Sequence, residues 1–161
     1  MSAIPTTPSY LNRDIRQRDI VPPQKLARCH ALVIGVGAIG RQVALQLAAA
    51  GLAKMELIDD DAVAVENLAP QAYWVQDLAL PKVEATARAC RLLNPEIDLS
   101  ARRDRFRRAS PKELATFADQ RAWPIVFCCV DSIECRRLVA APSRNSRAER
   151  FCLGRLSRER R

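Results

Sequence analysis

The sequence lacks any run of about 18 consecutive apolar residues, and its first residues show neither the basic start nor the apolar core of a secretory signal. These absences exclude a membrane-spanning helix and predict a cytoplasmic protein. The chain has 6 cysteines but no C-x-x-C pair, which argues against a disulfide framework or a zinc site. We therefore expect reduced thiols that act mostly as small apolar side chains.

The chain does contain enough apolar sequence for one domain with a core, since 48% of its 161 residues are hydrophobic. Its net charge of +8 lies almost entirely at the end of the chain, because residues 136–161 carry 9 arginines and 2 glutamates. A second Arg-rich stretch, residues 101–108, has no aromatic platform beyond Phe106. We interpret it as an exposed loop after a strand, so nucleic-acid binding is not favoured.

Apolar runs alternate with helical patterns along most of the chain. The expected strands are residues 30–35, 54–59, 97–102 and 124–130, and the expected helices are residues 41–51, 82–94 and 110–120. Such alternation predicts an α/β fold: a Rossmann-like, mostly parallel sheet with helices on both faces.

Three parts follow from this pattern. Residues 1–30 are expected to be an N-terminal helical segment broken by Pro22 and Pro23. Residues 31–139 form the predicted Rossmann-like nucleotide-binding domain. Residues 140–161 are rich in arginine and without a helical or strand period, so we expect a disordered tail.

A glycine turn joins the first expected strand to the first expected helix, the context in which G-x-G-x-x-G is informative. Gly35 permits a tight turn, Gly37 allows a phosphate to approach the backbone, and Gly40 allows the helix to pack on the strand. The free N–H groups at the helix start, from Ala38 onward, favour an anion. A glycine turn that packs without a ligand remains the alternative.

Three consecutive acids, Asp59 to Asp61, follow the second expected strand. Asp59 lies about 20 residues after the turn, where an NAD enzyme has the acid that binds the ribose hydroxyls. Asp61 shares its side of an extended chain with Asp59. A hydride-transfer site has no use for this second acid, so a dehydrogenase explains only part of the pattern.

Four motifs in register, GVGAIG, DDDAVAVENLAPQ, LPKVEAT and CCVDS, resemble those of the ThiF-like family. This family comprises ATP-dependent activators of ubiquitin-like proteins and includes the ThiF, MoeB and HesA types. The resemblance runs from about Tyr10 to Val139. It implies an adenylyltransferase in which the C-terminal carboxylate of a small ubiquitin-like or sulfur-carrier protein attacks the α-phosphorus of ATP with the help of Mg²⁺.

The resemblance also implies a set of site residues. The nucleotide-binding positions are Gly35, Gly37, Ala38, Gly40, Asp59, Asp61, Asn67, Gln71 and Lys82. Asp59 would bind the ribose, while Asn67 and Lys82 would contact the phosphates, and Asp131 would hold Mg²⁺. Arg13 would reach the ATP of a partner subunit, which implies a homodimer. The alternative is that some of these side chains have no role in binding. Asp60 is then a solvated side chain, Asp131 a helix N-cap, and Arg13 and Lys82 ordinary surface charges.

The chain departs from the family pattern in two ways. Pro70 occupies the position of a family arginine, and losing that cation is expected to slow the reaction about 10³-fold or more. The family's further strands, cysteine-bearing loop and paired C-x-x-C motifs are missing, so we expect a truncated chain whose sheet is incomplete at its C-terminal end. An NAD-binding oxidoreductase and a non-catalytic remnant that binds nucleotide or a partner through an exposed sheet edge remain alternatives.

Overall fold

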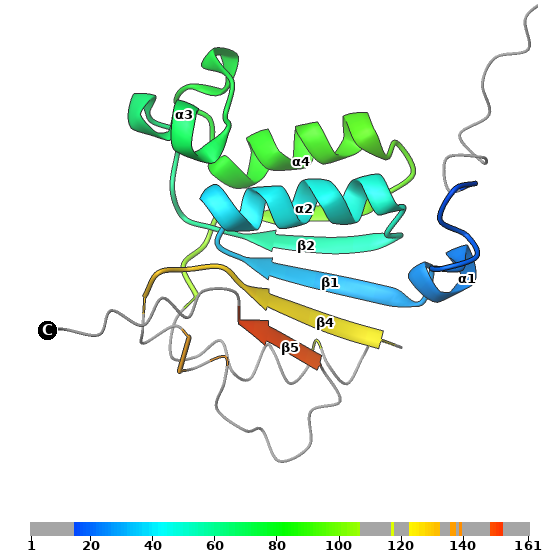
Figure 1. Ribbon diagram of the computed structural model, residues 1–161. Coiled ribbons are helices and arrows are strands. Elements are labelled where there is room, and N and C mark those ends of the chain that lie inside the picture. The colour runs from blue at the N-terminus through cyan, green and yellow to red at the C-terminus, as the bar shows by residue number, and fades with distance from the viewer. Residues whose placement is uncertain are drawn as a thin grey trace, which may run out of the picture.

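The computed structural model describes residues 15–106, 117, 123–132, 136, 137, 139 and 149–152. Five strands form one parallel sheet in the order β3-β2-β1-β4-β5, and Figure 1 shows α2 and α4 side by side on one face. The strands are β1 (Cys29–Ile34), β2 (Lys54–Ile58), β3 (Asp98–Arg102), β4 (Trp123–Cys128) and β5 (Glu149–Cys152). The α-helices are α1 (Pro23–Leu26), α2 (Ala38–Ala50), α3 (Leu68–Gln71) and α4 (Lys82–Leu93), and two short 3₁₀ helices are η2 (Val65–Asn67) and η3 (Val75–Asp77).

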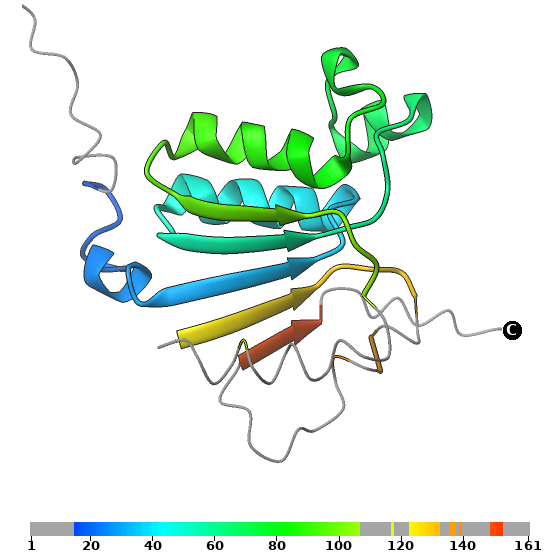
Figure 2. The same ribbon diagram turned by 180° about the vertical axis from the view of Figure 1, so that it is seen from behind.

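Strand β1 is the centre of the sheet and is buried on both faces. Alternate side chains of a strand point to opposite faces, so Val33 packs with α2 and α4 while Leu32 and Ile34 pack on the other side. That second face is covered by Phe117 and Val139, which both have helical backbone. The predicted Rossmann-like parallel sheet is confirmed, with α2 and α4 on its first face, and Figure 2 shows this arrangement from behind.

The two helices on the first face end where the sequence predicts, and α4 also begins where it predicts. Gly51 closes α2 in the left-handed conformation, with φ of 95°, and its N–H donates to the Ala48 carbonyl at 3.1 Å. Helix α2 starts three residues earlier than expected, at Ala38, because the glycine turn ends at Gly37. Helix α4 stops before Asn94, whose buried side-chain amide donates to the Leu52 carbonyl at 3.0 Å.

The strand register brings three loops to one edge of the sheet. Ile34 pairs with Ile58 on one side and with Cys128 on the other. Gly35, Asp59 and Cys129 therefore leave the sheet together. The strand order also reverses at β1, between β2 and β4, and ligands of open α/β sheets bind outside the strand ends at such a point.

Two expectations for the ends of the chain need correction. Pro23 does not break a helix but begins α1, because the first position of a helix has no backbone hydrogen bond for proline to remove. In the segment predicted to be disordered, Glu149–Cys152 forms β5 and pairs with β4. Tyr10, Arg13, the remainder of residues 140–161 and most of the expected helix 110–120 lie outside the described residues.

None of the helices in the described part of the chain is long and apolar enough to cross a bilayer.

Candidate functional site

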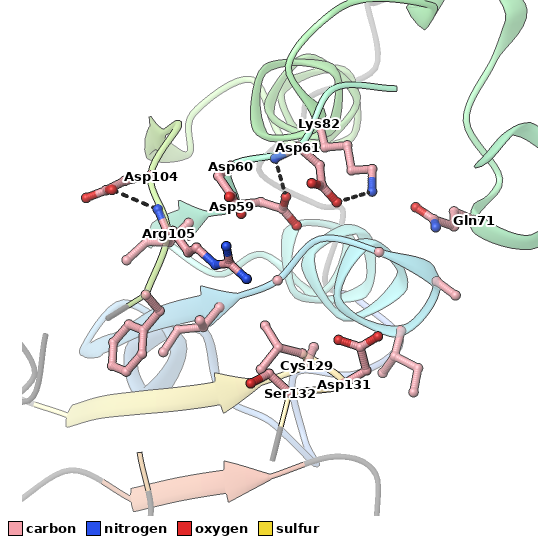
Figure 3. A pocket seen from close by; sticks show the side chains of 18 of the residues that line it. Asp59, Asp60, Asp61, Gln71, Lys82, Asp104, Arg105, Cys129, Asp131 and Ser132 are labelled. Carbon is pink, nitrogen blue, oxygen red and sulfur yellow. Dashed lines mark hydrogen bonds and ion pairs between the residues drawn. The ribbon is translucent and has the colours of Figure 1, made fainter. Parts of the chain in front are cut away.

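A pocket of about 620 Å³ opens at the edge where β1, β2 and β4 end. Its size is within the usual range for small-molecule sites. Figure 3 shows acidic, basic and amide side chains from several elements around it. Eight of the predicted nucleotide-binding and metal residues line it: Gly35, Gly37, Ala38, Asp59, Asp61, Gln71, Lys82 and Asp131. Gly40 and Asn67 are not among the lining residues.

The glycine turn has the geometry that the sequence predicts at two of its three glycines. Gly35 has a φ of +83°, and a Cβ there would lie 2.7 Å from a side-chain carbon of Val130. A Cβ on Gly40 would lie 1.8 Å from the Gly35 carbonyl oxygen. At Gly37 the nearest atom is the Gln71 Oε1 at 3.8 Å, an ordinary contact distance. Protein packing therefore requires Gly35 and Gly40, whereas Gly37 faces space that a ligand could fill.

Helix α2 begins at this turn without a side-chain cap, because Gly37 is its N-cap residue. The first N–H groups of a helix have no partner within the helix and lie at the positive end of its dipole. Ala38, the first residue of α2, lines the pocket. This end of the pocket is therefore suited to phosphate oxygens.

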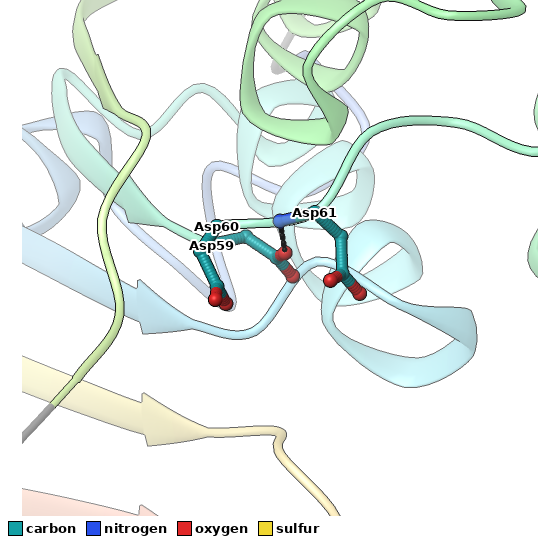
Figure 4. Close-up of side chains that lie close together, drawn as sticks. All are labelled: Asp59, Asp60 and Asp61. Carbon is teal, nitrogen blue, oxygen red and sulfur yellow. Dashed lines mark hydrogen bonds between the residues drawn. The ribbon is translucent and has the colours of Figure 1, made fainter.

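The carboxylate of Asp59 joins the glycine turn to the acidic loop. One oxygen accepts the Val36 N–H at 2.8 Å, and the other accepts the Asp61 N–H at 2.9 Å, the bond drawn in Figure 4. Burial raises the pKa of Asp59, although these two N–H donors lower it in part. Each oxygen keeps a further lone pair that could accept a hydroxyl donor such as that of a ribose.

Lys82 and Asp61 form an ion pair at the start of α4. The Lys82 Nζ lies 2.8 Å from the Asp61 Oδ2, and 7% of the Lys82 side chain is exposed against 63% for Asp61. The interpretation of Lys82 as a plain surface charge is therefore wrong. Because a helix start disfavours a cation, the Asp61 carboxylate supplies local compensation for a lysine held in the pocket.

Gln71 and Asn67 behave differently although they lie close together in the sequence. The Oε1 of Gln71 is buried and has no hydrogen-bond partner within the described part of the chain. A buried unsatisfied acceptor costs stability, so a ligand donor at this point would be favourable. The Asn67 Oδ1 instead accepts the Ala64 N–H at 2.9 Å and caps η2 outside the pocket lining.

Asp131 follows β4 and faces the same pocket as Asp59. Its side chain is exposed, and Figure 3 shows it on the β4 side of the site. Asp59, Asp60 and Asp61 each place a carboxylate oxygen within 4.8 Å of the others. The pocket thus has oxygen ligands of the kind that Mg²⁺ prefers on two strand ends. Asp60 is exposed, as expected for a solvated side chain.

Sequence reasoning missed Arg105 as a residue of the pocket. It belongs to the stretch interpreted only as an exposed loop, but it lines the site together with Phe106. Figure 3 shows its guanidinium extending toward the Asp59 side. The position of Arg105 just after a parallel strand could have indicated this role, because the ends of neighbouring strands meet at one edge of the sheet.

The strand order, glycine turn and lining residues define a Rossmann-like nucleotide-binding protein. The sequence profile of the ThiF family matches residues 11–148, and the chain belongs to this family. The resemblance found in its motifs is thereby confirmed.

Relatives and solved structures agree with this assignment. The chain is 34% identical over 119 residues to the sulfur carrier protein ThiS adenylyltransferase of Escherichia coli K12, covering 73% of this chain and 45% of that protein. It is 30% identical over 128 residues to the molybdopterin-synthase adenylyltransferase of Haemophilus influenzae Rd, covering 78% and 51%. The chain thus spans about half the length of these curated relatives.

The fold is also similar to E. coli tRNA N6-threonylcarbamoyladenosine dehydratase, TcdA, solved in complex with ATP. The TM-score is 0.76 at 25% sequence identity, over 91% of this chain and 61% of that chain.

Proposed function

We propose that the pocket binds ATP and that the protein adenylates the C-terminal carboxylate of a small ubiquitin-like or sulfur-carrier protein. The observation that carries this proposal is the meeting of the glycine turn, Asp59, Lys82 and Asp131 around one pocket. An adenylyltransferase of a sulfur carrier protein among the relatives, and an ATP complex among the similar structures, support it.

In this reaction a carboxylate oxygen of the small protein bonds to the α-phosphorus of ATP. The bond from that phosphorus to the bridging oxygen of the β-phosphate breaks, and its electron pair leaves with pyrophosphate. The step needs no general acid–base pair, so positioning and neutralisation of negative charge provide the catalysis. Lys82 would contact the phosphates, Asp59 would accept ribose hydroxyls, and Asp131 would hold Mg²⁺, which neutralises phosphate charge when bound.

The Asp61–Lys82 ion pair concerns how the Lys82 ammonium group is positioned before ATP binds. Without a ligand the ammonium group is oriented by Asp61 at 2.8 Å. A triphosphate offers oxygens of higher charge, and charge-assisted hydrogen bonds to them are strong. We therefore expect Lys82 to be held near the phosphate position before ATP arrives.

Lys82→Met tests the binding proposal because methionine retains the length of the buried stem while removing the charge. Isothermal titration with Mg·ATP and with NAD would be run side by side on the wild-type and Lys82→Met proteins. We expect the wild-type protein to bind Mg·ATP, and Lys82→Met to lose about 10²-fold or more in affinity or rate. Preferential binding of NAD, or Mg·ATP affinity unchanged in Lys82→Met, would contradict the proposal.

Exchange of labelled pyrophosphate into ATP tests the adenylation step itself. The exchange should require a small protein that ends in a free carboxylate and should disappear when that carboxylate is amidated. ATP binding without any exchange in the presence of candidate small proteins would instead support a non-catalytic remnant. The effect of Pro70, which is exposed on α3, would be measured by restoring arginine at that position.

We further propose a homodimer in which Arg13 acts on the ATP of the partner subunit. Mixing Arg13→Ala protein with Lys82→Met protein would then create one intact site per mixed dimer. In an equimolar mixture about half of the dimers are mixed and each has one intact site of two, so pyrophosphate exchange should return to about a quarter of the wild-type rate. No recovery on mixing, with each variant folded, would argue against the trans role.

A further inference from the structure

Arg41 is a buried cation that the proposed reaction does not use directly. It lies in the first turn of α2 with 0% of its surface exposed and does not line the pocket. Among the described residues it has no carboxylate partner, and its Nη2 has no hydrogen bond. A buried charge without an acid is unfavourable, so its surroundings must compensate in another way.

Two aromatic rings and two oxygens surround the guanidinium instead. Its central carbon lies 4.2 Å from the centre of the Tyr73 ring and 4.9 Å from that of Trp74, both distances typical of cation–π contacts. The Nε donates to the Ala72 carbonyl at 3.1 Å, and Nη1 donates to the Thr86 hydroxyl at 3.4 Å. Three consecutive residues, Ala72 to Trp74, thus contact one arginine.

The first of these three residues, Ala72, has an unusual backbone. Ala72 has φ of 56° and ψ of 36°, the left-handed region that a residue with a Cβ rarely adopts. It ends α3 directly after Gln71 and turns the chain so that Tyr73 enters the core. The Tyr73 hydroxyl then donates to the Val36 carbonyl in the glycine turn at 2.7 Å. Burial raises the pKa of Tyr73 to about 12, so this hydroxyl remains a donor at neutral pH.

These contacts connect Arg41 to the unpaired amide in the pocket. The buried Gln71 Oε1 lies 3.8 Å from the point where a Gly37 Cβ would be, and Ala72 is the residue that fixes the direction of the chain after it. Resting on the proposed function, we infer that Arg41 is a positioning residue. It holds the left-handed turn at Ala72 and thereby keeps the Gln71 amide at the phosphate end of the nucleotide pocket.

The test combines loss of the arginine with relief of the backbone strain. Arg41→Met removes the charge and the bond to Ala72, and we expect it to weaken Mg·ATP binding on the order of 10-fold, with faster amide hydrogen exchange in residues 72–74. Adding Ala72→Gly should raise the affinity again by roughly 3-fold, to about a third of the wild-type value, because glycine adopts the left-handed region without a steric cost. A role of Arg41 in stability alone would not produce this rescue.

Arg91→Met is the matched control. Arg91 lies in the last turn of α4 and, like Arg41, donates to a backbone carbonyl, that of Leu99 at 2.8 Å. This variant should leave both ATP affinity and exchange at residues 72–74 unchanged. Arg41→Lys, which keeps the charge but cannot bond Ala72 and Thr86 together, replaces Arg41→Met if that variant does not fold, and it should show the same two changes in smaller degree.

The outcomes separate this inference from the proposed function. Wild-type protein that binds no ATP would contradict the proposed function, and the exchange measurement, which needs no nucleotide, would still decide whether Arg41 holds the turn. If wild type binds ATP and the Arg41 variants bind it equally well, or if exchange at residues 72–74 does not change, the positioning role is overturned. Weakened binding that Ala72→Gly fails to restore would also overturn it.

Discussion

Two aspartates of this protein have pKa values displaced in opposite directions by different causes. Burial raises the pKa of Asp59 above the ordinary value of about 3.8. The hydrogen bond from Lys54, at 2.8 Å, lowers the pKa of the exposed Asp98 below that value. The first effect depends on exclusion of water and the second on a charged neighbour at the surface.

The first prediction is that carbon-detected NMR titration will place Asp59 above and Asp98 below the usual aspartate range. Raising the salt concentration should move Asp98 back toward 3.8 and leave Asp59 largely unchanged, because salt screens exposed charges most strongly. Mg·ATP should lower the pKa of Asp59, since hydroxyl donors favour the ionised carboxylate. Equal values for the two residues would contradict the structure at both places.

The same shifts fix the sign of their contributions to stability. Because the pKa of Asp59 is raised by folding, its contribution is present below pH 3.8 and is lost as the pH rises through the raised value. The contribution of Asp98 has the opposite sign: it is present above pH 3.8 and is lost as the pH falls through the lowered value. Asp98→Asn should therefore lower the free energy of unfolding at pH 7, by little since the pair is exposed, and this difference should shrink as the pH falls through the lowered pKa of Asp98.

The sequence predicted which side chains line the pocket better than it predicted the hydrogen bonds that individual side chains form. Asp59, Lys82 and Asp131 follow or begin regular elements, so the geometry of a parallel sheet places them at one edge. Asn67 lies in a long loop, where no periodicity constrains orientation, and it caps η2 instead. Arg41 has a similar explanation, because its contacts come from residues 31 to 45 positions away that no local pattern connects.

At the scale of elements, the glycines of the turn differ in how closely the protein packs against them. Gly40 permits the start of α2 to lie against the end of β1, and the 1.8 Å separation leaves no space for a methyl group. Gly37 has no such restraint from the protein, and its φ of −71° is accessible to any residue.

The second prediction compares alanine at these two glycines. Gly40→Ala should lower the free energy of unfolding by about 1–3 kcal/mol or more, because the helix start must move away from the strand. Gly37→Ala should lower it by less, about 0.5–1 kcal/mol, because alanine is a poorer N-cap residue than glycine. It should nevertheless weaken Mg·ATP binding, since the methyl group occupies ligand space. Urea denaturation and isothermal titration of both variants would measure the two effects.

A reversed order of stability, with Gly37→Ala the more damaging to folding, would contradict the packing described for the turn. Full ATP affinity in a folded Gly37→Ala protein would contradict the assignment of its free space to the nucleotide.

The elements that the sequence predicted are those with strong local signals. The β1 run is continuously apolar and α2 ends at a glycine, so their existence and limits follow from local chemistry. Strand β5 has only four residues, and its pairing with β4 is a long-range contact that an arginine-rich sequence conceals. The loop after Asp61 contains η2, α3 and η3, and its two ends are joined by the Ala62–Pro81 bridge, a contact between distant residues that no local pattern predicts.

At the scale of the whole molecule, the sheet differs at its two edges. On one side β3 pairs with β2 along its full length, from Asp98 to Arg102. On the other side β5 covers β4 from Ile125 to Cys128. An unpaired strand edge is a template for association with other chains, so β5 protects the edge of β4.

The third prediction follows from this difference and uses two truncations that differ only by β5. A stop codon after residue 152 retains the strand, and one after residue 148 removes it. Loss of β5 should lower the free energy of unfolding by about 2–4 kcal/mol, since each backbone hydrogen bond contributes about 1 kcal/mol net. It should also increase self-association with concentration, because the open edge of β4 contains buried-type apolar residues flanked by few charges. Urea denaturation gives the first quantity and light scattering after size exclusion gives the second. If the two truncated proteins are equally stable and equally monodisperse, β5 does not protect β4, and the edge must be covered in another way.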